Sequence, residues 1–476
     1  MARNSSFTDT LLSDDELVNK QLAKLHGGTQ RFKTLARIKL SKKKFDTATR
    51  LKDMWTKEDE KSHEYKVFIL DTKPLQTKEK WNELIQKGIT HLTIEDNDNK
   101  LKAISPDVSN ILTLRSFTLI WSKVKTIPDH LLQMDHLSEL RFDKCALKSI
   151  DNIQLGQALR HLELTNAGLK TIPLEIGNVT ALMTLNLTGN QLKTLPISMA
   201  NLNQLQTLKA CGNKFSVVPA CIEELKTLDT LDLSQNHIGQ IPDGIGNLSS
   251  LTTLRMSHNN IAILPASFVN LKRLVNLYLG YNAFAEVPEQ LANLSALQAL
   301  NMASNGIKTI KATPKSLKIL LLDKNQLEEL PPAVFECEHL EVLQVANNRI
   351  GEIPAQIDRL EMLRTLHAGG NPLSGIPADR CLPPQLRHLS LCDTRIKNPP
   401  AQLRRLQNLH LLDLQRTEVK ESYRRVLQAD DIKLLVADLT PEDGQQEENK
   451  VSSGDATGPL KSQGSKIKRE TLYPPS

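Results

Sequence analysis

The chain has 476 residues, of which 39% are apolar and 4% aromatic, and its 60 Lys/Arg and 54 Asp/Glu give a net charge of +6. This composition excludes a fibrous or wholly disordered protein. The sequence contains no run of about 18 apolar residues, which a membrane-spanning helix requires, and no apolar signal-peptide core near its start. We therefore expect a cytoplasmic, intracellular protein in which the 6 scattered cysteines stay reduced.

Residues 1–80 form a basic N-terminal extension. They hold 18 Lys/Arg and 12 Asp/Glu, so the whole net charge of the chain lies there. Ser13 and Glu16 form a capping box, which predicts a short helix over about residues 14–26. The apolar side of this helix would consist of Leu17, Val18, Leu22 and Leu25.

Residues 31–45 mix basic and apolar side chains. Such a segment either docks peripherally on an acidic partner or an anionic membrane surface, or serves as a solvated linker, and the sequence leaves both open. Within it, Arg37–Leu40 loosely resembles a phosphatase-docking motif, with Leu40 in place of the aromatic residue of that motif.

A 23-residue repeat fills most of the remaining chain. The segments that begin at Leu182, Leu228 and Leu251 read LMTLNLTGNQL, LDTLDLSQNHI and LTTLRMSHNNI, and so share the pattern LxxLxLxxNxL. Its ninth position is occupied by Asn190, Asn213, Asn236, Asn259, Asn282, Asn305, Asn325, Asn348 and Asn371. Degenerate copies place Asn97, Ser122, Cys145, Ala167, Thr394 and Thr417 in the same position. These copies give about 15 repeats over residues 84–420.

The spacing of the repeat predicts an α/β solenoid. The alternating apolar positions form a short strand with one buried face, and stacked strands make a curved parallel sheet on the concave side. The second half of each repeat, as in Pro196–Leu202, suits a short helix on the convex side. Each asparagine amide can donate and accept, so we expect the nine asparagines to form a structural ladder between coils. The single 20-residue step, from Asn305 to Asn325, lacks the helical half and predicts a tighter coil.

The third, fifth, seventh and eighth positions of the pattern point away from the core and form the default partner surface. The fifth positions from Arg141 to Arg255 alternate in charge through Glu163, Lys209 and Asp232. This alternation disfavours nucleic acid, which requires a continuous basic stripe. The protein-binding candidates are Arg141, Glu163, Lys209, Asp232, Arg255, Tyr278, Tyr281, Ile319, Leu321 and Val342.

The last five of these candidates are aromatic or aliphatic residues at nominally exposed positions. One interpretation is an interface hot spot. The other is that Tyr278 stacks on neighbouring strands and that the shortened coil buries Ile319 and Leu321. Trp121 is a weaker candidate, because it lies in an irregular early repeat and can equally close the core.

The C-terminal flank differs from the repeats. Helical spacing of apolar residues predicts a capping helix over residues 421–439, which would cover the open core of the last coil. Residues 440–476 contain few large apolar side chains, and we expect a disordered tail.

The pattern LxxLxLxxNxL, and the copies that follow TLPISMANLNQLQTLKACGNKF, resemble the intracellular 23-residue class of leucine-rich repeats. This class occurs in Ras-binding leucine-rich scaffolds, in the repeat regions of Erbin and Scribble, and in plant intracellular Ras-group leucine-rich proteins. The resemblance implies a scaffold or adaptor in signalling, with a small GTPase or a protein phosphatase as partner.

No constellation of residues predicts catalysis, a metal or a cofactor, so we expect a non-catalytic protein-binding scaffold. A structural or assembly protein of a cytoskeletal or ciliary complex is the alternative. A regulator that inhibits an enzyme by occlusion is a third possibility, and the sequence does not separate them.

Overall fold

The computed structural model describes residues 66–69, 72, 75, 78–96, 101–147, 150, 158–376, 382–398, 403, 406–419 and 434–437. The expected helix over residues 14–26, the basic segment 31–45 and the expected tail 440–476 lie outside the described residues.

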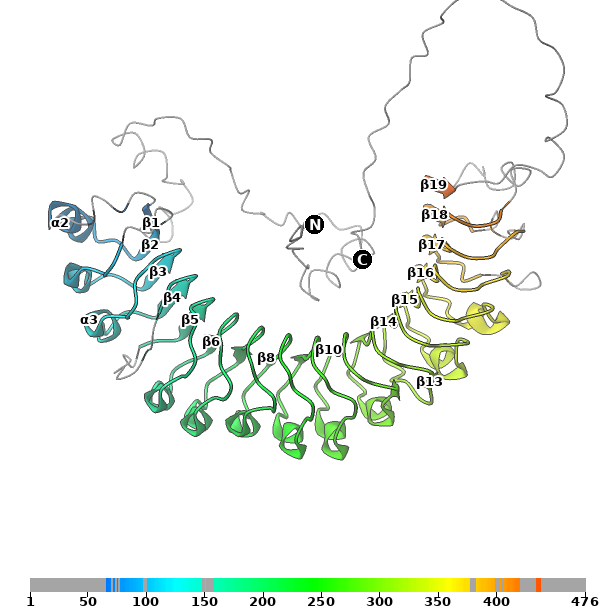
Figure 1. The fold of residues 1–476 in the computed structure, drawn as a ribbon, viewed down its shortest axis with the longest axis horizontal. Helices are drawn as coiled ribbons and strands as arrows, with labels where there is room; N and C mark the ends of the chain where they lie inside the picture. The colour runs from blue at the N-terminus through cyan, green and yellow to red at the C-terminus, as the bar shows by residue number, and fades with distance from the viewer. Residues whose placement is uncertain are drawn as a thin grey trace, which may run out of the picture.

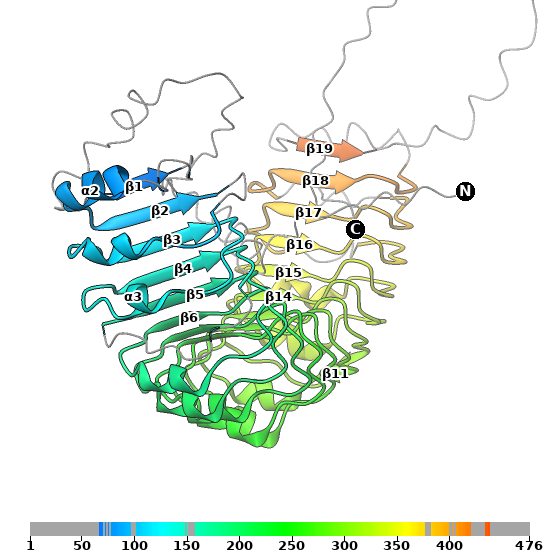
Figure 2. The same cartoon turned by 60° about the vertical axis from the view of Figure 1, so that its left-hand side comes forward.

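One parallel sheet of 17 strands runs through the described chain, and each strand pairs with the next repeat (Figures 1 and 2). Its first nine strands are β1 (Lys66–Ile69), β2 (His91–Glu95), β3 (Ser116–Ile120), β4 (Glu139–Asp143), β5 (His161–Thr165), β6 (Thr184–Asn186), β7 (Thr207–Lys209), β8 (Thr230–Asp232) and β9 (Thr253–Arg255). The remaining eight are β10 (Asn276–Tyr278), β12 (Ala299–Asn301), β14 (Ile319–Leu321), β15 (Val342–Gln344), β16 (Thr365–His367), β17 (His388–Ser390), β18 (Leu411–Leu414) and β19 (Leu434–Ala437). The predicted α/β solenoid is therefore confirmed, with the sheet on the concave side of the arc.

The sheet extends beyond the predicted solenoid limits of 84 and 420 at both ends. Strand β1 pairs in parallel with β2, and β19 pairs in parallel with β18. Residues 434–437 thus form a strand, which corrects the prediction of a capping helix over 421–439 for these four residues. Residues 421–433 and 438–439 of that expected helix lie outside the described residues.

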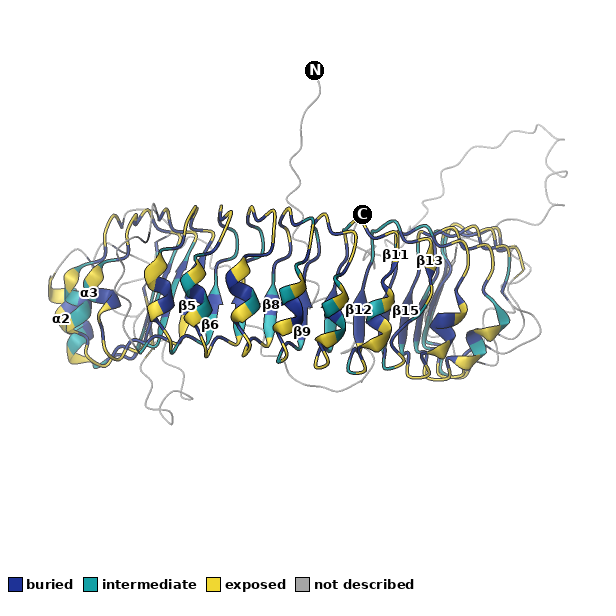
Figure 3. Cartoon of the chain, turned by 90° about the horizontal axis from the view of Figure 1, so that it is seen from below, coloured by how far each residue is buried: buried dark blue, intermediate teal, exposed yellow. Residues whose placement is uncertain are grey.

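Short helices lie on the convex side, and most of them are 3-10 helices of five residues. Among the described residues, the α-helices are α2 (Lys78–Gln86) and α3 (Asp129–Leu132). The 3-10 helices are η3 (Pro106–Asn110), η4 (Leu174–Asn178), η5 (Ile197–Asn201), η6 (Ala220–Glu224), η7 (Asp243–Asn247), η8 (Ala266–Asn270), η9 (Glu289–Asn293), η10 (Pro332–Glu336) and η11 (Ala355–Arg359). Figure 3 shows them from the convex side, where buried and exposed residues alternate.

A proline at the N-cap starts each of these helices from η4 to η11. In η5, the carbonyl of Pro196 accepts a hydrogen bond from the amide of Met199 at 3.1 Å, which is the i to i+3 bond of a 3-10 turn. Proline fixes φ near −65° and lacks an N–H that would go unpaired at this end. Each of these helices is only five residues long, and short helices of this length commonly adopt the tighter 3-10 turn.

The core is one continuous row of buried side chains between sheet and helices. Leucines at equivalent positions lie in register on neighbouring strands, as Leu185, Leu208 and Leu231 do. Each of these three side chains is fully buried. Truncating such a buried leucine to alanine costs about 2–5 kcal/mol, so stacking of repeats supplies the stability that a single repeat lacks.

Each of the nine asparagines joins its own coil to the preceding one. Asn259 is representative: its amide nitrogen donates to the carbonyls of Leu233 and Met256, each at 3.0 Å, and its oxygen accepts from the amide of Ile238 at 2.9 Å. At the C-terminal end the threonines make fewer bonds, since Thr394 Oγ1 donates to the carbonyl of Leu391 within its own coil. The asparagine ladder is therefore strongest in the central repeats.

The 20-residue coil between Asn305 and Asn325 has no helix, as its sequence predicts. Its chain instead forms β13 (Thr309–Ile310), which pairs in parallel with β11 (Glu286–Val287) in a separate two-stranded sheet. Thr313 Oγ1 donates to the carbonyl of Ala333 at 2.7 Å and so joins this coil to the next one.

The eighth position of the repeat has a left-handed backbone in 14 successive repeats. These residues are Trp121, Lys144, Asn166, Gly189, Gly212, Gln235, His258, Tyr281, Ser304, Lys324, Asn347, Gly370, Asp393 and Arg416. The left-handed turn directs the chain away from the strand, so that the asparagine that follows enters the core. It also places the eighth side chains along one edge of the concave face.

Candidate functional site: the concave face

The fifth-position side chains form one row across the concave face, because the strands pair in register. Arg141 lies beside Glu163, and this row continues through Asn186 and Lys209 to Asp232. The Nε atom of Arg141 is 3.3 Å from a carboxylate oxygen of Glu163, and both side chains remain partly exposed. The structure therefore brings the charged candidates together as a row of alternating sign.

The outward side chains divide the concave face into two parts. On β6, β7 and β8 the outward residues are partly or fully exposed. On β9, β12, β14 and β15 every residue of the strand is buried. We call the concave side of β4–β8 the open stretch, and it contains Arg141, Glu163, Lys209 and Asp232.

Tyr278, Ala299, Ile319, Leu321 and Val342 form a hydrophobic cluster separate from the main core, which we call the apolar cluster. Tyr278 and Leu321 retain 1% and 2% of their surface, Ile319 2% and Val342 none. The interpretation that these four side chains form an exposed interface is therefore wrong, and the burial of Tyr278, Ile319 and Leu321 agrees with the alternative interpretation. The prediction failed because a period-2 pattern shows which side of a strand a residue faces and not what lies over that side.

Arg255 adjoins the apolar cluster. Its guanidinium carbon lies 5.0 Å from the centre of the Tyr278 ring, within the range of a cation–π contact. Arg255 is 8% exposed, so this fifth-position candidate belongs to the buried part of the face and not to the open stretch.

The eighth-position edge carries contacts that the sequence analysis missed. Lys144 Nζ lies 3.8 Å from the centre of the Trp121 ring, and Trp121 is 44% exposed. Tyr281, which is 46% exposed, stacks on His258 with ring centres 4.0 Å apart. Trp121 therefore lies at the surface and does not close the core, and its spacing of 23 residues from Lys144 was the available signal.

The described residues contain no arrangement that indicates catalysis or metal binding. No group of three or more His, Cys, Asp or Glu among them is placed to hold a metal ion. Burial raises the pKa of the Cys145 and Cys221 thiols to about 11, which disfavours the nucleophilic thiolate. Burial also raises the pKa of Asp323 to about 7, although its carboxylate accepts a hydrogen bond from the amide of Ala346 at 2.7 Å.

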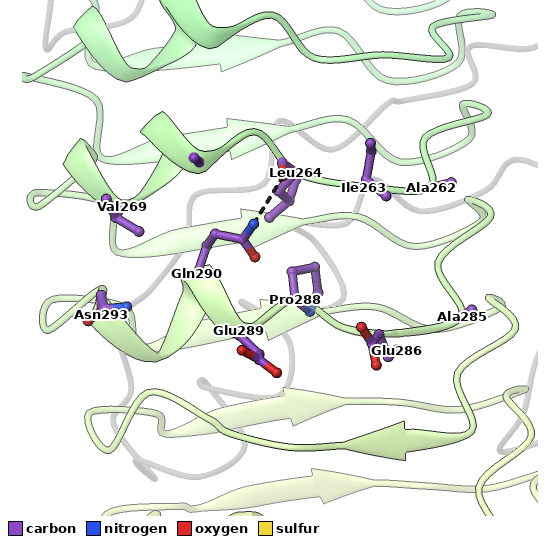
Figure 4. Close-up of a pocket in the computed structure, with 11 residues that line it drawn as sticks. Ala262, Ile263, Leu264, Val269, Ala285, Glu286, Pro288, Glu289, Gln290 and Asn293 are labelled. Carbon is purple, nitrogen blue, oxygen red and sulfur yellow. Dashed lines mark hydrogen bonds between the residues drawn. The ribbon is translucent and has the colours of Figure 1, made fainter.

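A groove of about 700 Å³ opens between two coils on the convex side (Figure 4). Ile263, Val269 and Pro288 give it an apolar lining, and Gln290 Nε2 donates across it to the carbonyl of Leu264 at 3.2 Å. Glu286 and Glu289 at its margin both form ion pairs with Lys311. The groove therefore shows no charge that would select a ligand.

None of the described helices is long and apolar enough to cross a membrane. None of the curated proteins compared with the chain matches it by sequence.

Solved structures share the solenoid. They include a leucine-rich repeat protein of Leptospira interrogans (TM-score 0.67, 24% identity, 75% of this chain and 93% of that chain covered). The plant peptide hormone receptor RGFR1 in complex with RGF2 is also similar (TM-score 0.53, 24% identity, 74% and 63% covered). So is TLR13 in complex with ssRNA13 (TM-score 0.60, 22% identity, 74% and 54% covered). At these identities the similarity shows the fold, and the neighbours bind different classes of ligand.

Two family models match the repeats. The model described as a leucine-rich repeat region matches residues 113–235 and 230–313, and the model described as leucine rich repeat matches residues 315–373. The finer assignment to the intracellular 23-residue class stays a prediction. Since these models together match more than half of its residues, the chain belongs to the leucine-rich repeat family.

Proposed function

We propose that this chain is a non-catalytic scaffold or adaptor that binds protein partners on the concave face in the cytoplasm. Leucine-rich repeat proteins generally serve as protein-binding scaffolds, and the open stretch is the observation that carries the proposal for this chain. Over β4–β8 the face is partly exposed, flat along the strands and lined by charges of alternating sign. A partner with the opposite alternation would pair with it charge by charge.

The same row argues for a protein and against a nucleic acid. Binding to phosphates requires several cations without intervening anions, whereas Glu163 and Asp232 interrupt the cations of this row. Trp121 and Tyr281 at the neighbouring edge offer exposed aromatic surface of the kind that is enriched at protein interfaces.

One observation supports a cytoplasmic location. The 5 cysteines of the described chain form no disulfide bonds, which is the state expected in a reducing compartment.

The resemblance to the intracellular 23-residue class suggests signalling, with a small GTPase or a phosphatase as the partner. A structural role in a cytoskeletal or ciliary complex is the second candidate, because an extended concave surface also suits a static assembly. The two differ in how binding responds to the nucleotide state of the partner and to salt.

The test combines a charge reversal on the open stretch with a matched reversal on the convex side. The concave variant carries Glu163→Lys and Lys209→Glu, and the control carries Glu224→Lys and Lys226→Glu, an exposed pair 4.0 Å apart. Neither variant changes the net charge. Partners are recovered from cytosol by affinity purification and mass spectrometry and are then measured individually with purified protein.

A small GTPase that binds in one nucleotide state, or a phosphatase, should be lost in the concave variant and retained in the control. If the wild type and both variants co-sediment with filaments, and this co-sedimentation resists salt, the result would favour the structural candidate. Equal loss of a partner in both variants would contradict the assignment of the concave face.

A further inference from the structure

The turns that follow strands β3 to β7 carry a strongly basic surface. In each of these five coils the eighth to thirteenth positions of the repeat lead from the end of the strand to the convex side, along one edge of the solenoid. Six exposed lysines occupy these positions, and we call them the lysine edge: Lys123, Lys125, Lys144, Lys170, Lys193 and Lys214. None of the described residues at these positions of the five coils is acidic.

The charges of the lysine edge are not neutralised by the described part of the chain, where no acidic residue forms an ion pair with these lysines. Asp143 directly precedes Lys144, but its carboxylate accepts hydrogen bonds from Thr165 Oγ1 at 2.7 Å and from Asn166 Nδ2 at 3.0 Å. At the opposite edge, next to the first leucine of each of these coils, the described charged residues are Arg115, Asp135 and Arg160. The excess of positive charge therefore lies on one side of the solenoid.

The lysine edge is flat and continues into exposed apolar side chains. In Figure 3 the edge that contains β11 and β13, which are the thirteenth and fourteenth positions of their coils, is a nearly straight border of the solenoid. Neighbouring coils are about 5 Å apart, so the lysines of five coils extend over about 20 Å. Val217 and Ile263 occupy the thirteenth position of the fifth and the seventh coil, and they are 59% and 68% exposed. Cations and apolar side chains thus share one plane.

We propose that the lysine edge binds an anionic membrane surface, with its ammonium groups at the lipid headgroups and with Val217 and Ile263 at the boundary of the acyl chains. Lysines held near such a surface are attracted by its negative potential, and apolar side chains beside them add buried apolar area. A flat edge brings all six cations to a flat membrane at once, whereas the concave face is curved (Figure 1). This contact goes beyond the proposed function and does not depend on it, because it leaves the open stretch available to a partner.

A nucleic acid fits this edge less well than a membrane does. Its phosphates would also favour a row of cations without intervening anions. Surfaces that bind single strands add several aromatic rings on which bases stack. Among the described residues of these turns Trp121 is the exposed aromatic one, and Lys144 Nζ lies 3.8 Å from the centre of its ring. Val217 and Ile263, in contrast, suit an acyl boundary and offer nothing to a phosphate.

Binding of the purified full-length chain to lipid vesicles tests the contact. Vesicles of phosphatidylcholine mixed with phosphatidylserine are compared by co-sedimentation with vesicles of phosphatidylcholine alone, and the wild type should bind only the former. The edge variant carries Lys125→Gln, Lys170→Gln and Lys193→Gln. Each lysine at an anionic surface contributes a factor of about five, so this variant should bind about 100-fold more weakly.

The matched control carries Lys226→Gln, Lys272→Gln and Lys315→Gln, which remove the same charge. Each of these exposed lysines lies two residues before the first leucine of a coil, at the opposite edge. The control should bind as the wild type does. Both variants keep the basic residues 1–80, so equal binding by the wild type and both variants would assign the binding to another part of the chain and overturn the proposal.

The apolar contact is tested by Val217→Ser with Ile263→Ser. Its control is Leu174→Ser with Ile197→Ser, which removes two exposed apolar side chains from the convex helices η4 and η5. The first variant should bind vesicles several-fold more weakly than the second. Equal binding by these two variants, or no binding of the wild type to vesicles that contain phosphatidylserine, would contradict the membrane contact. Binding of a single-stranded RNA that only the edge variant loses, without vesicle binding, would assign the edge to nucleic acid instead.

Discussion

Replacing Asn259 by alanine measures what one step of the asparagine ladder contributes to stability. The carbonyls of Leu233 and Met256 lose one bond each but keep a second, because Asn236 and Asn282 also donate to them at 3.0 Å. The amide of Ile238 loses its partner and becomes an unsatisfied buried donor. An orphaned buried donor costs about 1–3 kcal/mol, and each lost bond about 0.5–1.5 kcal/mol. One orphaned donor and two lost bonds together cost about 2–6 kcal/mol.

Urea unfolding followed by far-UV circular dichroism gives the free-energy difference, provided that the slope of the transition is unchanged. Asn260→Ala is the matched control, because Asn260 is the next residue and is exposed. An exposed substitution of this kind changes stability by less than about 0.5 kcal/mol. If Asn259→Ala and Asn260→Ala have the same midpoint, the ladder is not a source of stability and the reasoning fails.

Three further substitutions test other features of the coils. Gln235 has a φ of 54°, so Gln235→Gly should relieve about 1 kcal/mol of left-handed strain and raise the urea midpoint. Burial raises the pKa of Asp323 above its unfolded value of 3.8 to about 7, so the folded chain binds the additional proton and stability falls as pH rises between these values. Asp323→Asn should therefore melt higher than the wild type above pH 7 and equally below pH 4. A Cβ on Gly177 would lie 2.3 Å from the carbonyl oxygen of Ser198, so Gly177→Ala should lower the free energy of unfolding in urea by about 1–3 kcal/mol. Gly239→Ala is the control and should leave the free energy of unfolding unchanged, because a Cβ on Gly239 meets no atom within 4 Å.

The sequence predicts the solenoid well because each repeat encodes its own structure and its contact with the next. The leucine spacing sets the buried side of the strand, and the asparagine sets the turn inward. These are nearest-neighbour relations at a fixed period. The coil that lacks the helical half, between Asn305 and Asn325, was predictable for the same reason.

Exposure on the concave face was not predictable in this way. Lys209 and Leu321 occupy the same position of the repeat, yet one is exposed and the other retains 2% of its surface. Leu321 packs with the apolar side chains of neighbouring strands in the apolar cluster, whereas Lys209 lies between Asn186 and Asp232. The burial of an outward side chain therefore depends on several neighbouring repeats and not on its own repeat alone. The left-handed eighth position was missed for a different reason. Glycine fills it in only three of the 14 repeats, and residues such as Trp121 and Tyr281 give no local indication of a positive φ.

The open stretch sets limits on how a partner is recognised. Adjacent charges of its row lie on neighbouring strands about 5 Å apart, well within the screening length of about 8 Å at physiological ionic strength. Because Arg141 and Glu163 have opposite charges and pair with each other, their fields cancel at longer distances. The row therefore exerts little long-range attraction. It favours binding only of a partner whose charges are complementary to the row at contact. Such a surface discriminates between folded proteins by the pattern of their charges, which is the property that a scaffold requires and a general polyanion-binding surface lacks.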